Sequence, residues 1–550
     1  MKTINSFRSK LLALTFALMA SVSSFAHDFS VDGIYYNIID EKNVEVTYKG
    51  SSFYEDEYKN EVVIPDSVTY NGVSYIVTSI GKNAFAYSAL KTITIGNNVK
   101  SVGDDAFSTC NLLASVTMGT AVQNVGKYAF YNCSYLSVID SVPNSLTTVE
   151  ESAFRACRQL TAINLPDSVT TIGDYAFYEC YRLASVTLGN GLTSIGSQAF
   201  MYCSALKSIV IPNSVTNIGE SAFSCCSSLD SVAIGNGLRK ISDHTFYKCS
   251  ALAYFTMPDS IESIGKHAFF TCKSLKNINV PRTVTTIGDY AFSGCSSLTS
   301  IEIPSGVTSI GEDAFRYCSS LTSIELPNGV TSIGEWAFYG CSSLTSVEIP
   351  NTVTYIGDYA FSWCESLTSI YCYAESVPET DSYAFYNAPS DMVIYVPEQS
   401  IYAYKIASPW KKYTIMVMPY FVTVASNPED AGIITGAGAY AINDTVTLTA
   451  TANEGYKFIN WTENDSVISE VAEYTFVVEN DREFVANFEL LTYEVTASVN
   501  DENFGAVTGA DTYSHGEEVT LTATANEGYK FVNWTENDTV VSTEAEYSFV

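Results

Sequence analysis

The apolar positions of this chain follow one pattern that recurs along most of its length. Residues 310–330 read IGEDAFRYCSSLTSIELPNGV, which generalises to I-G-x-x-A-F-x-x-C-x-x-L-x-x-I-x-(I/L)-P-x-x-V. The phenylalanine of this unit occurs fourteen times at intervals of 22 to 24 residues. Its positions are Phe85, Phe107, Phe130, Phe154, Phe177, Phe200, Phe223, Phe246, Phe269, Phe292, Phe315, Phe338, Phe361 and Phe385. So regular a period is typical of a repeat architecture.

Each unit divides into a strand segment and a turn segment. The apolar residues of L-x-x-I-x-I alternate, which predicts a short β-strand with one inward side. The proline or glycine that follows ends the strand and turns the chain. The A-F-x-x-C segment places Ala, Phe and Cys at roughly three-residue spacing, which predicts a helical or 3₁₀ turn on the opposite wall.

One unit cannot bury its apolar side alone, so the units must stack. We therefore expect a repeat solenoid, a right-handed coil of about 14 turns with short parallel strands lining one concave face. At about 4.8 Å per coil its length is on the order of 60–70 Å.

Twelve of the fourteen cysteines recur once per unit instead of in an irregular disulfide framework. They are Cys110, Cys133, Cys157, Cys180, Cys203, Cys226, Cys249, Cys272, Cys295, Cys318, Cys341 and Cys364. A small side chain repeated at one register predicts a ladder of buried thiols. Rungs about 5 Å apart could instead be bridged by disulfides. No C-x-x-C or paired histidine accompanies the ladder to favour zinc.

The A-F-x-x-C-x-x-L-x-x-I-x-I-P unit resembles the leucine-rich repeat of BspA-type (treponemal-type) bacterial surface proteins, over about residues 28–418. Residues 31–36 and 61–69 resemble the family's N-terminal cap, and residues 394–412 resemble its closing cap with a short helix. The resemblance implies a cap over 27–78, a leucine-rich-repeat solenoid over 79–390 and a C-terminal cap over 391–418.

From about Tyr420 the period disappears and a different duplication begins. Residues 447–469 (TLTATANEGYKFINWTENDSVIS) recur as residues 520–542 (TLTATANEGYKFVNWTENDTVVS). Their alternation and Gly-Tyr turns predict small all-β domains over 419–490 and 491–550, which resemble internalin-B-type extracellular repeat domains. The second copy stops inside the matching strand, so we expect a truncated domain, and any cell-wall or outer-membrane sorting signal would lie beyond it.

Residues 1–26 carry the features of a secretory signal peptide. A basic start precedes the apolar run LLALTFALMA, and small residues stand before His27. The apolar run is too short to span a bilayer. We expect a secreted protein, extracellular or on the cell surface, without direct membrane insertion.

The formal charge of −32 limits the partners of the protein. A field of this sign repels nucleic acid and anionic lipid. It is compatible with a cation or a basic partner. We expect a monomer whose partner is an extracellular protein or glycan.

Catalytic motifs are missing from the sequence. The chain contains four histidines and no G-x-S-x-G, H-E-x-x-H, P-loop or EF-hand motif. His244 and His267 occupy the same column of the repeat, so they should stack in adjacent coils as a metal pair or as two exposed polar residues. We predict no enzyme activity, no catalytic residue and no organic cofactor.

Three glutamates occupy the outward strand position of consecutive units: Glu302, Glu325 and Glu348. They should stand about 5 Å apart on the concave face. One interpretation is a calcium site or an acidic strip for a basic partner. The other is that recent duplications copied a solvated glutamate.

Aromatic residues beside the repeated Ala-Phe form a second candidate surface. The ligand-binding candidates are Tyr290, Tyr317, Trp336, Tyr339, Tyr359 and Trp363, together with Tyr371 at the outward strand position. Exposed Tyr and Trp are typical of recognition sites. The alternative is packing between coils along the convex ridge.

Three functions are compatible with these features. The first is adhesion to host or bacterial protein or glycan ligands through a face of the solenoid. The second is a structural scaffold or spacer without a dedicated ligand. The third is a glycan-binding component of a nutrient system.

Overall fold

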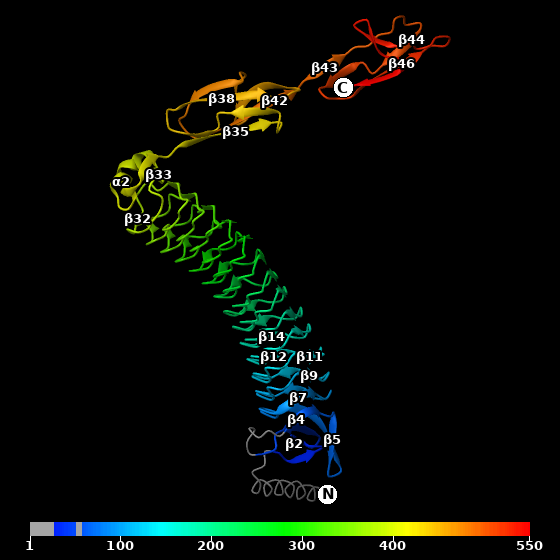
Figure 1. The fold of residues 1–550 in the computed structure, drawn as a ribbon, viewed down its shortest axis with the longest axis vertical. Helices are drawn as coiled ribbons and strands as arrows, with labels where there is room; N and C mark the ends of the chain where they lie inside the picture. Colours follow the sequence, from blue (N-terminus) through cyan, green and yellow to red (C-terminus); the bar gives the residue numbers. More distant parts are fainter. Residues whose placement is uncertain (1–26, 51–57) are drawn as a thin grey trace, which may run out of the picture. The chain divides into compact units, whose positions relative to one another are not determined.

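The computed structural model describes residues 27–50 and 58–550. The predicted signal peptide lies outside the described residues. The chain divides into two compact units at Met416/Val417, and each is described by itself (Figure 1). In the described ranges, no helix is long and apolar enough to cross a membrane.

The first unit is a solenoid of stacked coils built on two parallel ladders, which confirms the predicted repeat fold. One ladder contains the strands of the L-x-x-I-x-I segment, and equivalent residues pair one repeat apart, as Ser346 with Ser369. Its strands are β4 (Lys59–Val63), β7 (Ala89–Thr94), β9 (Ser115–Thr117), β11 (Val138–Asp140), β13 (Ala162–Asn164), β15 (Ser185–Thr187), β17 (Ser208–Ile211), β19 (Ser231–Ile234), β21 (Tyr254–Thr256), β23 (Asn277–Ile278), β25 (Ser300–Ile301), β27 (Ser323–Glu325), β29 (Ser346–Ile349), β31 (Ser369–Cys372) and β33 (Val393–Val396). We call the outer surface of this ladder the long-strand face.

The second ladder was not predicted from the sequence. Two-residue strands just before the repeated glycine pair in parallel from coil to coil, as Ile333 with Ile356. After β6 (Val73–Ile80) they are β8 (Ser101–Val102), β10 (Asn124–Val125), β12 (Thr148–Val149), β14 (Thr171–Ile172), β16 (Ser194–Ile195), β18 (Asn217–Ile218), β20 (Lys240–Ile241), β22 (Ser263–Ile264), β24 (Thr286–Ile287), β26 (Ser309–Ile310), β28 (Ser332–Ile333), β30 (Tyr355–Ile356) and β32 (Glu379–Thr380). Two residues are too few to show alternation, so the sequence pattern did not reveal these strands.

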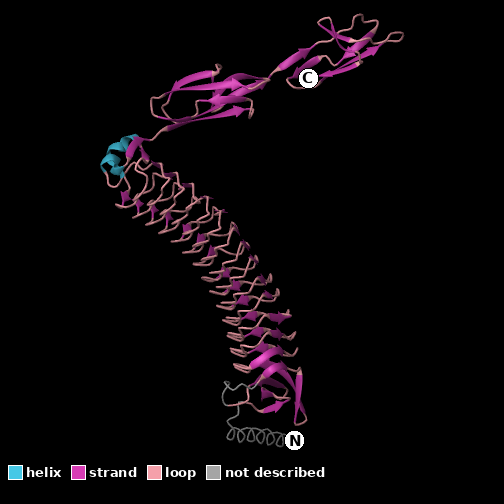
Figure 2. Ribbon diagram, viewed as in Figure 1, coloured by secondary structure: helices cyan, strands magenta, loops and turns pink. Residues whose placement is uncertain are grey.

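The A-F-x-x-C segment forms a turn, as predicted, and does not extend into a helix (Figure 2). In one coil the amides of Arg316 and Cys318 donate to carbonyls three residues earlier, as in a 3₁₀ turn. The alternate amides, of Phe315 and Tyr317, donate instead to the carbonyls of Ala337 and Tyr339 in the next coil, at 2.8 and 2.7 Å. Asp313 and Tyr317 have positive φ, 53° and 57°. Every second amide therefore joins neighbouring coils, and no helix can propagate.

The core is a set of stacked columns running through the coils. The repeated phenylalanines are buried and stack face to face, as Phe269 on Phe292 at 5.3 Å with an interplanar angle of 1°. The repeated Cys, Leu, Ile and Val positions are also buried. Burying one such large apolar side chain stabilises the fold by about 1.5–3 kcal/mol.

The cysteine ladder is buried and its thiols are free of disulfides. Each thiol donates a hydrogen bond to the phenylalanine carbonyl of the preceding coil, as Cys318 Sγ to Phe292 O at 3.3 Å. The same carbonyl accepts the amide of Cys295 within its own coil, at 3.1 Å. Cysteine therefore supplies both a small apolar volume and a weak donor.

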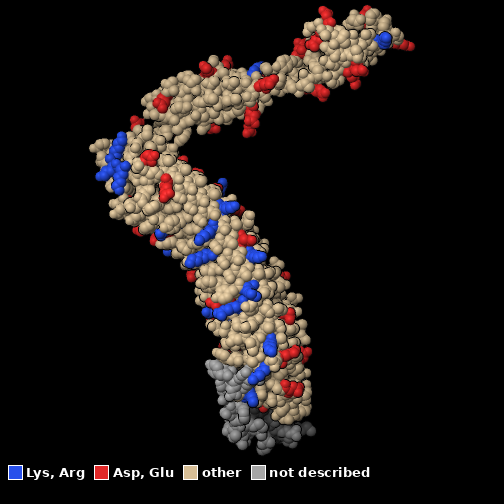
Figure 3. Space-filling view, in the orientation of Figure 1, with Lys and Arg blue, Asp and Glu red and all other residues tan. Residues whose placement is uncertain are grey.

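Both ends of the solenoid are covered. At the N-terminal end lie β1 (Phe29–Val31), β2 (Ile34–Ile38), β3 (Asn43–Thr47), β5 (Ser67–Tyr70) and β6 (Val73–Ile80). At the other end lie η1 (Glu398–Ser400), α2 (Ile401–Ile406), η2 (Trp410–Lys412) and β34 (Thr414–Val417). Trp410 is fully buried with its ring 5.1 Å from Phe385, the last repeated phenylalanine. The elements α2 and η2 carry three lysines, and Figure 3 shows basic side chains gathered over this cap.

The second unit contains two all-β modules that follow the duplication. Module A, residues 420–490, contains the sheets β37-β35-β42-β39-β40 and β36-β38-β41. Its strands are β35 (Tyr420–Asn427), β36 (Gly432–Thr435), β37 (Gly438–Tyr440), β38 (Thr445–Ala452), β39 (Tyr456–Glu463), β40 (Ser466–Ser469), β41 (Glu473–Val477) and β42 (Arg482–Leu490). Trp461 and Phe484 are fully buried between the two sheets.

Module B, residues 491–550, repeats this order of strands. Its strands are β43 (Thr492–Val495), β44 (Gly505–Thr508), β45 (Asp511–Ser514), β46 (Val519–Ala525), β47 (Trp534–Glu536), β48 (Thr539–Ser542) and β49 (Glu546–Phe549). Trp534 occupies the place of Trp461 and packs beside Phe531, at 5.6 Å between rings.

Candidate functional site

The predicted glutamate strip lies on the long-strand face. Glu302 bridges to Glu325, and Glu325 pairs with Glu348 in the parallel ladder. All three side chains are exposed. Tyr371 follows in the same column and stacks on Tyr395 at 4.9 Å. Across the residues that the structure describes, no three His, Cys, Asp or Glu side chains group as a metal site.

The other candidate residues lie on the surface formed by the A-F-x-x-C turns, which we call the turn face. It has three columns: the residue before Ala, the residue after Phe and the residue before Cys. The first column contains Tyr290, Trp336 and Tyr359, the second Tyr339, and the third Tyr317 and Trp363. The structure therefore brings six of the seven candidates together and places Tyr371 on the long-strand face.

Rings of the first column stack on one another between coils. His267 stacks on Tyr290 at 4.5 Å with an interplanar angle of 4°. Trp336 stacks on Tyr359 at 4.3 Å, and Tyr359 stacks on Tyr383 at 5.2 Å. Stacking covers the ring faces that a ligand would contact. For this column the packing interpretation fits the geometry better than recognition.

Arg316, in the second column, contacts aromatic rings of all three columns, including that of Tyr317 at 5.0 Å. Its guanidinium carbon lies 4.9 Å from the centre of the Trp336 ring and 5.1 Å from that of Tyr339. The same group pairs with the buried carboxylate of Asp313 at 3.0 Å. Burial raises the pKa of Asp313, and the hydrogen bonds from Tyr290 and Arg316 oppose the shift. The cation is thus engaged within the protein.

The third column keeps exposed aromatic surface. Tyr317 is 49% exposed and lies across Gly340 of the next coil, where an added Cβ would stand 2.7 Å from its Cδ1. Trp363 is 42% exposed, and among the described rings none stacks on its indole. Of the six candidates on the turn face, these two have the most accessible rings.

The residues of the third column have a left-handed backbone conformation. Tyr317 and Trp363 both have φ of 57°. Left-handed backbone favours Gly and Asn and costs a larger residue about 1–2 kcal/mol. Other coils place Gly294, Gly340 or Asn387 at this position, but also Thr109, Glu179 and Lys248 with positive φ. The conformation is therefore a property of the repeat and does not select for an aromatic side chain.

The sequence did not single out Tyr254. Its side chain is 75% exposed on the long-strand face, at the outward position where the adjacent coils have Ser231 and Asn277. A large aromatic residue in a column of mostly small residues was the available signal.

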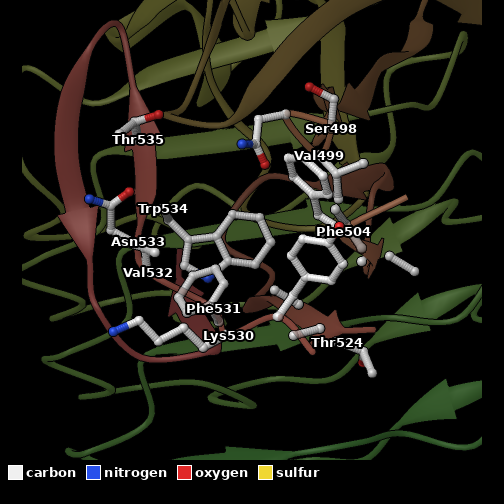
Figure 4. Close-up of a pocket in the computed structure, with 17 residues that line it drawn as sticks. Ser498, Val499, Phe504, Thr524, Lys530, Phe531, Val532, Asn533, Trp534 and Thr535 are labelled. Atoms are coloured by element: carbon white, nitrogen blue, oxygen red, sulfur yellow. The ribbon is translucent and has the colours of Figure 1, made fainter. Parts of the chain in front are cut away.

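The second unit has a groove of its own, in module B (Figure 4). Its volume is about 420 Å³, and Phe504, Phe531 and Trp534 line it. The flanking strands β43 and β47 correspond to β35 and β39, between which β42 pairs in module A.

Solved structures of bacterial leucine-rich-repeat proteins resemble this chain. A leucine-rich cell surface protein from Faecalibacterium prausnitzii is 29% identical, over 62% of this chain and 94% of that one, with a TM-score of 0.44. A leucine-rich-repeat protein from Bacteroides ovatus is 26% identical, over 71% of this chain and all of that one (100%), with a TM-score of 0.46. The pneumococcal vaccine antigen PcpA is 19% identical over 72% and 99% of the two chains, with a TM-score of 0.40. No curated protein matches the chain.

Family models cover both units. The model "BspA type Leucine rich repeat region (6 copies)" matches residues 47–184, 170–299 and 285–405. The model "Divergent InlB B-repeat domain" matches residues 422–491 and 495–550. Both resemblances noted in the sequence are confirmed, and they are consistent with a surface or protein-binding role. The chain belongs to the BspA-type leucine-rich-repeat family, with InlB-type repeat domains following the solenoid.

Proposed function

We propose that this protein is exported, acts outside the cell or on its surface, and is an adhesion protein that binds host or bacterial ligands through its solenoid. In this proposal it has no enzymatic activity. The solenoid supplies a long surface on a rigid core, as repeat proteins use for binding.

The observation that supports this proposal most is the exposed third column of the turn face. Trp363 and Tyr317 are large aromatic residues that remain 42% and 49% exposed. Internal ring stacking accounts for Trp336 and Tyr359 but not for Trp363. Exposed Trp and Tyr residues are enriched at binding hot spots because they bury large area with little loss of conformational entropy.

The net negative charge of the chain limits the classes of partner that it can bind. Acidic residues outnumber basic ones by 60 to 28, which disfavours nucleic acid and anionic membranes. Figure 3 shows acidic side chains spread over the visible surface of both units. The proposed partner is an extracellular protein or glycan bound by a single chain.

A binding panel tests the proposal. The whole chain is measured against immobilised fibronectin, fibrinogen, collagen, laminin and a glycan array, beside Trp363→Ala and Tyr317→Ala. We expect the wild-type chain to bind at least one of these ligands. At least one of the two variants should bind that ligand about tenfold or more weakly. Tyr402→Ala is the matched control, because Tyr402 is 74% exposed on α2.

Two results would overturn the proposal. The first is that both variants keep full affinity and unchanged melting temperatures, which would show that the turn face does not bind the ligand. The second is binding to no member of the panel together with self-association in sedimentation velocity. That result would favour the scaffold function.

A further inference from the structure

A shallow groove crosses the long-strand face over four coils. The outward residues of β21, β23, β25 and β27 line it, and its volume is about 720 Å³. At about 4.8 Å per coil these strands extend over on the order of 15 Å. The ladder is interrupted here, because β21 ends one sheet and β23 begins the next.

Tyr254 forms one side of this groove. Its ring is 75% exposed, and no other described ring packs against it. The adjacent residues in its column are Ser231 and Asn277, whose side chains are small. Unlike Tyr359 on the turn face, Tyr254 therefore presents a free ring face to a ligand.

Polar groups form the rest of the groove. Asn277, Asn279, Glu302 and Glu325 line it, and all four are exposed. The amides provide donors and acceptors, and the carboxylates provide acceptors only. The described hydrogen bonds and ion pairs occupy none of these four side chains, so their polar atoms face solvent or a ligand.

The lining discriminates between ligand classes. Beneath the groove, Phe255, Ile278 and Ile301 are buried in the core, so apolar peptide side chains find no pocket. The described residues that line the groove include no Lys or Arg. Glu302 and Glu325 would repel a sulfated or carboxylated sugar.

We propose that this groove binds a neutral oligosaccharide. One sugar ring lies with its C–H face on Tyr254, and its hydroxyls exchange hydrogen bonds with the amides of Asn277 and Asn279. Glu302 and Glu325 accept hydrogen bonds from hydroxyls of the next sugar units. The inference rests on the proposed binding function and adds a ligand class and a site separate from the turn face.

The test is a glycan array with neutral and acidic oligosaccharides, probed with the whole chain. Titration calorimetry with the best neutral hexasaccharide then compares wild type with Tyr254→Ala, Tyr254→Phe and Asn279→Ala. We expect Tyr254→Ala to weaken binding about thirtyfold, and Tyr254→Phe to stay within about twofold because the ring face is kept. Tyr402→Ala, an exposed tyrosine of α2 outside both surfaces, is the control and should bind normally.

Three outcomes would overturn the inference. One is that neutral glycans do not bind, another that acidic glycans bind more tightly, and the third that Tyr254→Ala binds as wild type with an unchanged melting temperature. If a matrix protein still binds in a Trp363-dependent manner, the proposed function survives the loss of this site. If neither glycan nor protein binds, both proposals fail.

Discussion

The thiol of Cys341 donates a hydrogen bond to the carbonyl oxygen of Phe315 in the preceding coil, at 3.2 Å. The same oxygen accepts the amide of Cys318 in its own coil, at 3.1 Å. One carbonyl thus joins two coils, and the arrangement recurs through the ladder. This geometry explains why the column contains cysteine and not alanine.

Replacing one cysteine of the ladder should lower the stability of the solenoid measurably. Cys341→Ala loses the thiol donor and leaves a small cavity, so we expect a loss of about 1–2 kcal/mol in denaturant unfolding. Cys341→Ser keeps a donor and should lose less than Cys341→Ala. The reverse order would show that the position requires only an apolar volume. Cys225→Ala is the control, because Cys225 lies outside the ladder and is half-buried.

The ladder thiols should resist alkylation in the native protein. Burial raises the pKa of Cys110, Cys295 and Cys364 to about 12, so the reactive thiolate is scarce. At pH 8.5 we expect iodoacetamide to add at most one group, at Cys225, and to modify all fourteen cysteines after unfolding. Intact mass spectrometry gives the count. Rapid labelling of several native thiols would contradict a buried, closed ladder.

Tyr317 and Gly340 should be energetically coupled. An alanine at Gly340 meets Cδ1 of Tyr317 at 2.7 Å and also adopts a φ of 70°. The left-handed backbone alone accounts for about 1 kcal/mol. We expect Gly340→Ala to lower the free energy of unfolding by at least about 1 kcal/mol more in the wild-type background than in a Tyr317→Ala background. Chemical denaturation of the four proteins measures this difference. Equal losses would mean that the ring moves aside freely.

Acidification should destabilise the solenoid partly through His267. Burial lowers the pKa of His267, and His244 lowers it further, while Asp243, Asp289 and Asp313 oppose the shift. The folded state then binds fewer protons than the unfolded state. This contribution to stability is present above the unfolded pKa of about 6.5 and decreases as the pH falls toward the folded value.

His267→Tyr places in this coil the residue that the next coil has at Tyr290, which preserves the stack. We expect its melting temperature to decrease less between pH 7.5 and pH 5.5 than that of wild type. His515→Gln, in module B, should leave the wild-type dependence unchanged. A His267→Tyr profile that parallels wild type would exclude His267 as a source of the dependence.

Calcium should not distinguish wild type from Glu325→Gln. Glu302, Glu325 and Glu348 form an exposed row, and in the described part of the chain no three such ligands converge. Calcium takes six to eight oxygen ligands, whereas a row provides few at any one point. Melting curves with and without 5 mM calcium, a concentration of about the order that weak extracellular sites require, measure this. If calcium raised the melting temperature of wild type more than that of Glu325→Gln, the interpretation of the glutamate strip as a cation site would be supported.

The period of the phenylalanines and cysteines determined the architecture from the sequence alone. One repeat corresponds to one coil, so equal spacing places Phe292 and Phe315 in the same column without knowledge of the path between them. Burial of Cys318 follows from the same count. The exposed position of Glu325 follows from strand alternation, since residues two apart share a face.

Only the tertiary structure decided which surface residues remain accessible. The short second ladder and the alternating turns depend on hydrogen bonds between residues about one repeat apart, as from Phe315 to Ala337. Ring orientation across the same spacing covers Tyr359 and leaves Trp363 and Tyr254 exposed. Local sequence pattern determines the direction in which a side chain leaves the backbone, but contact with the next coil determines whether a neighbour covers it.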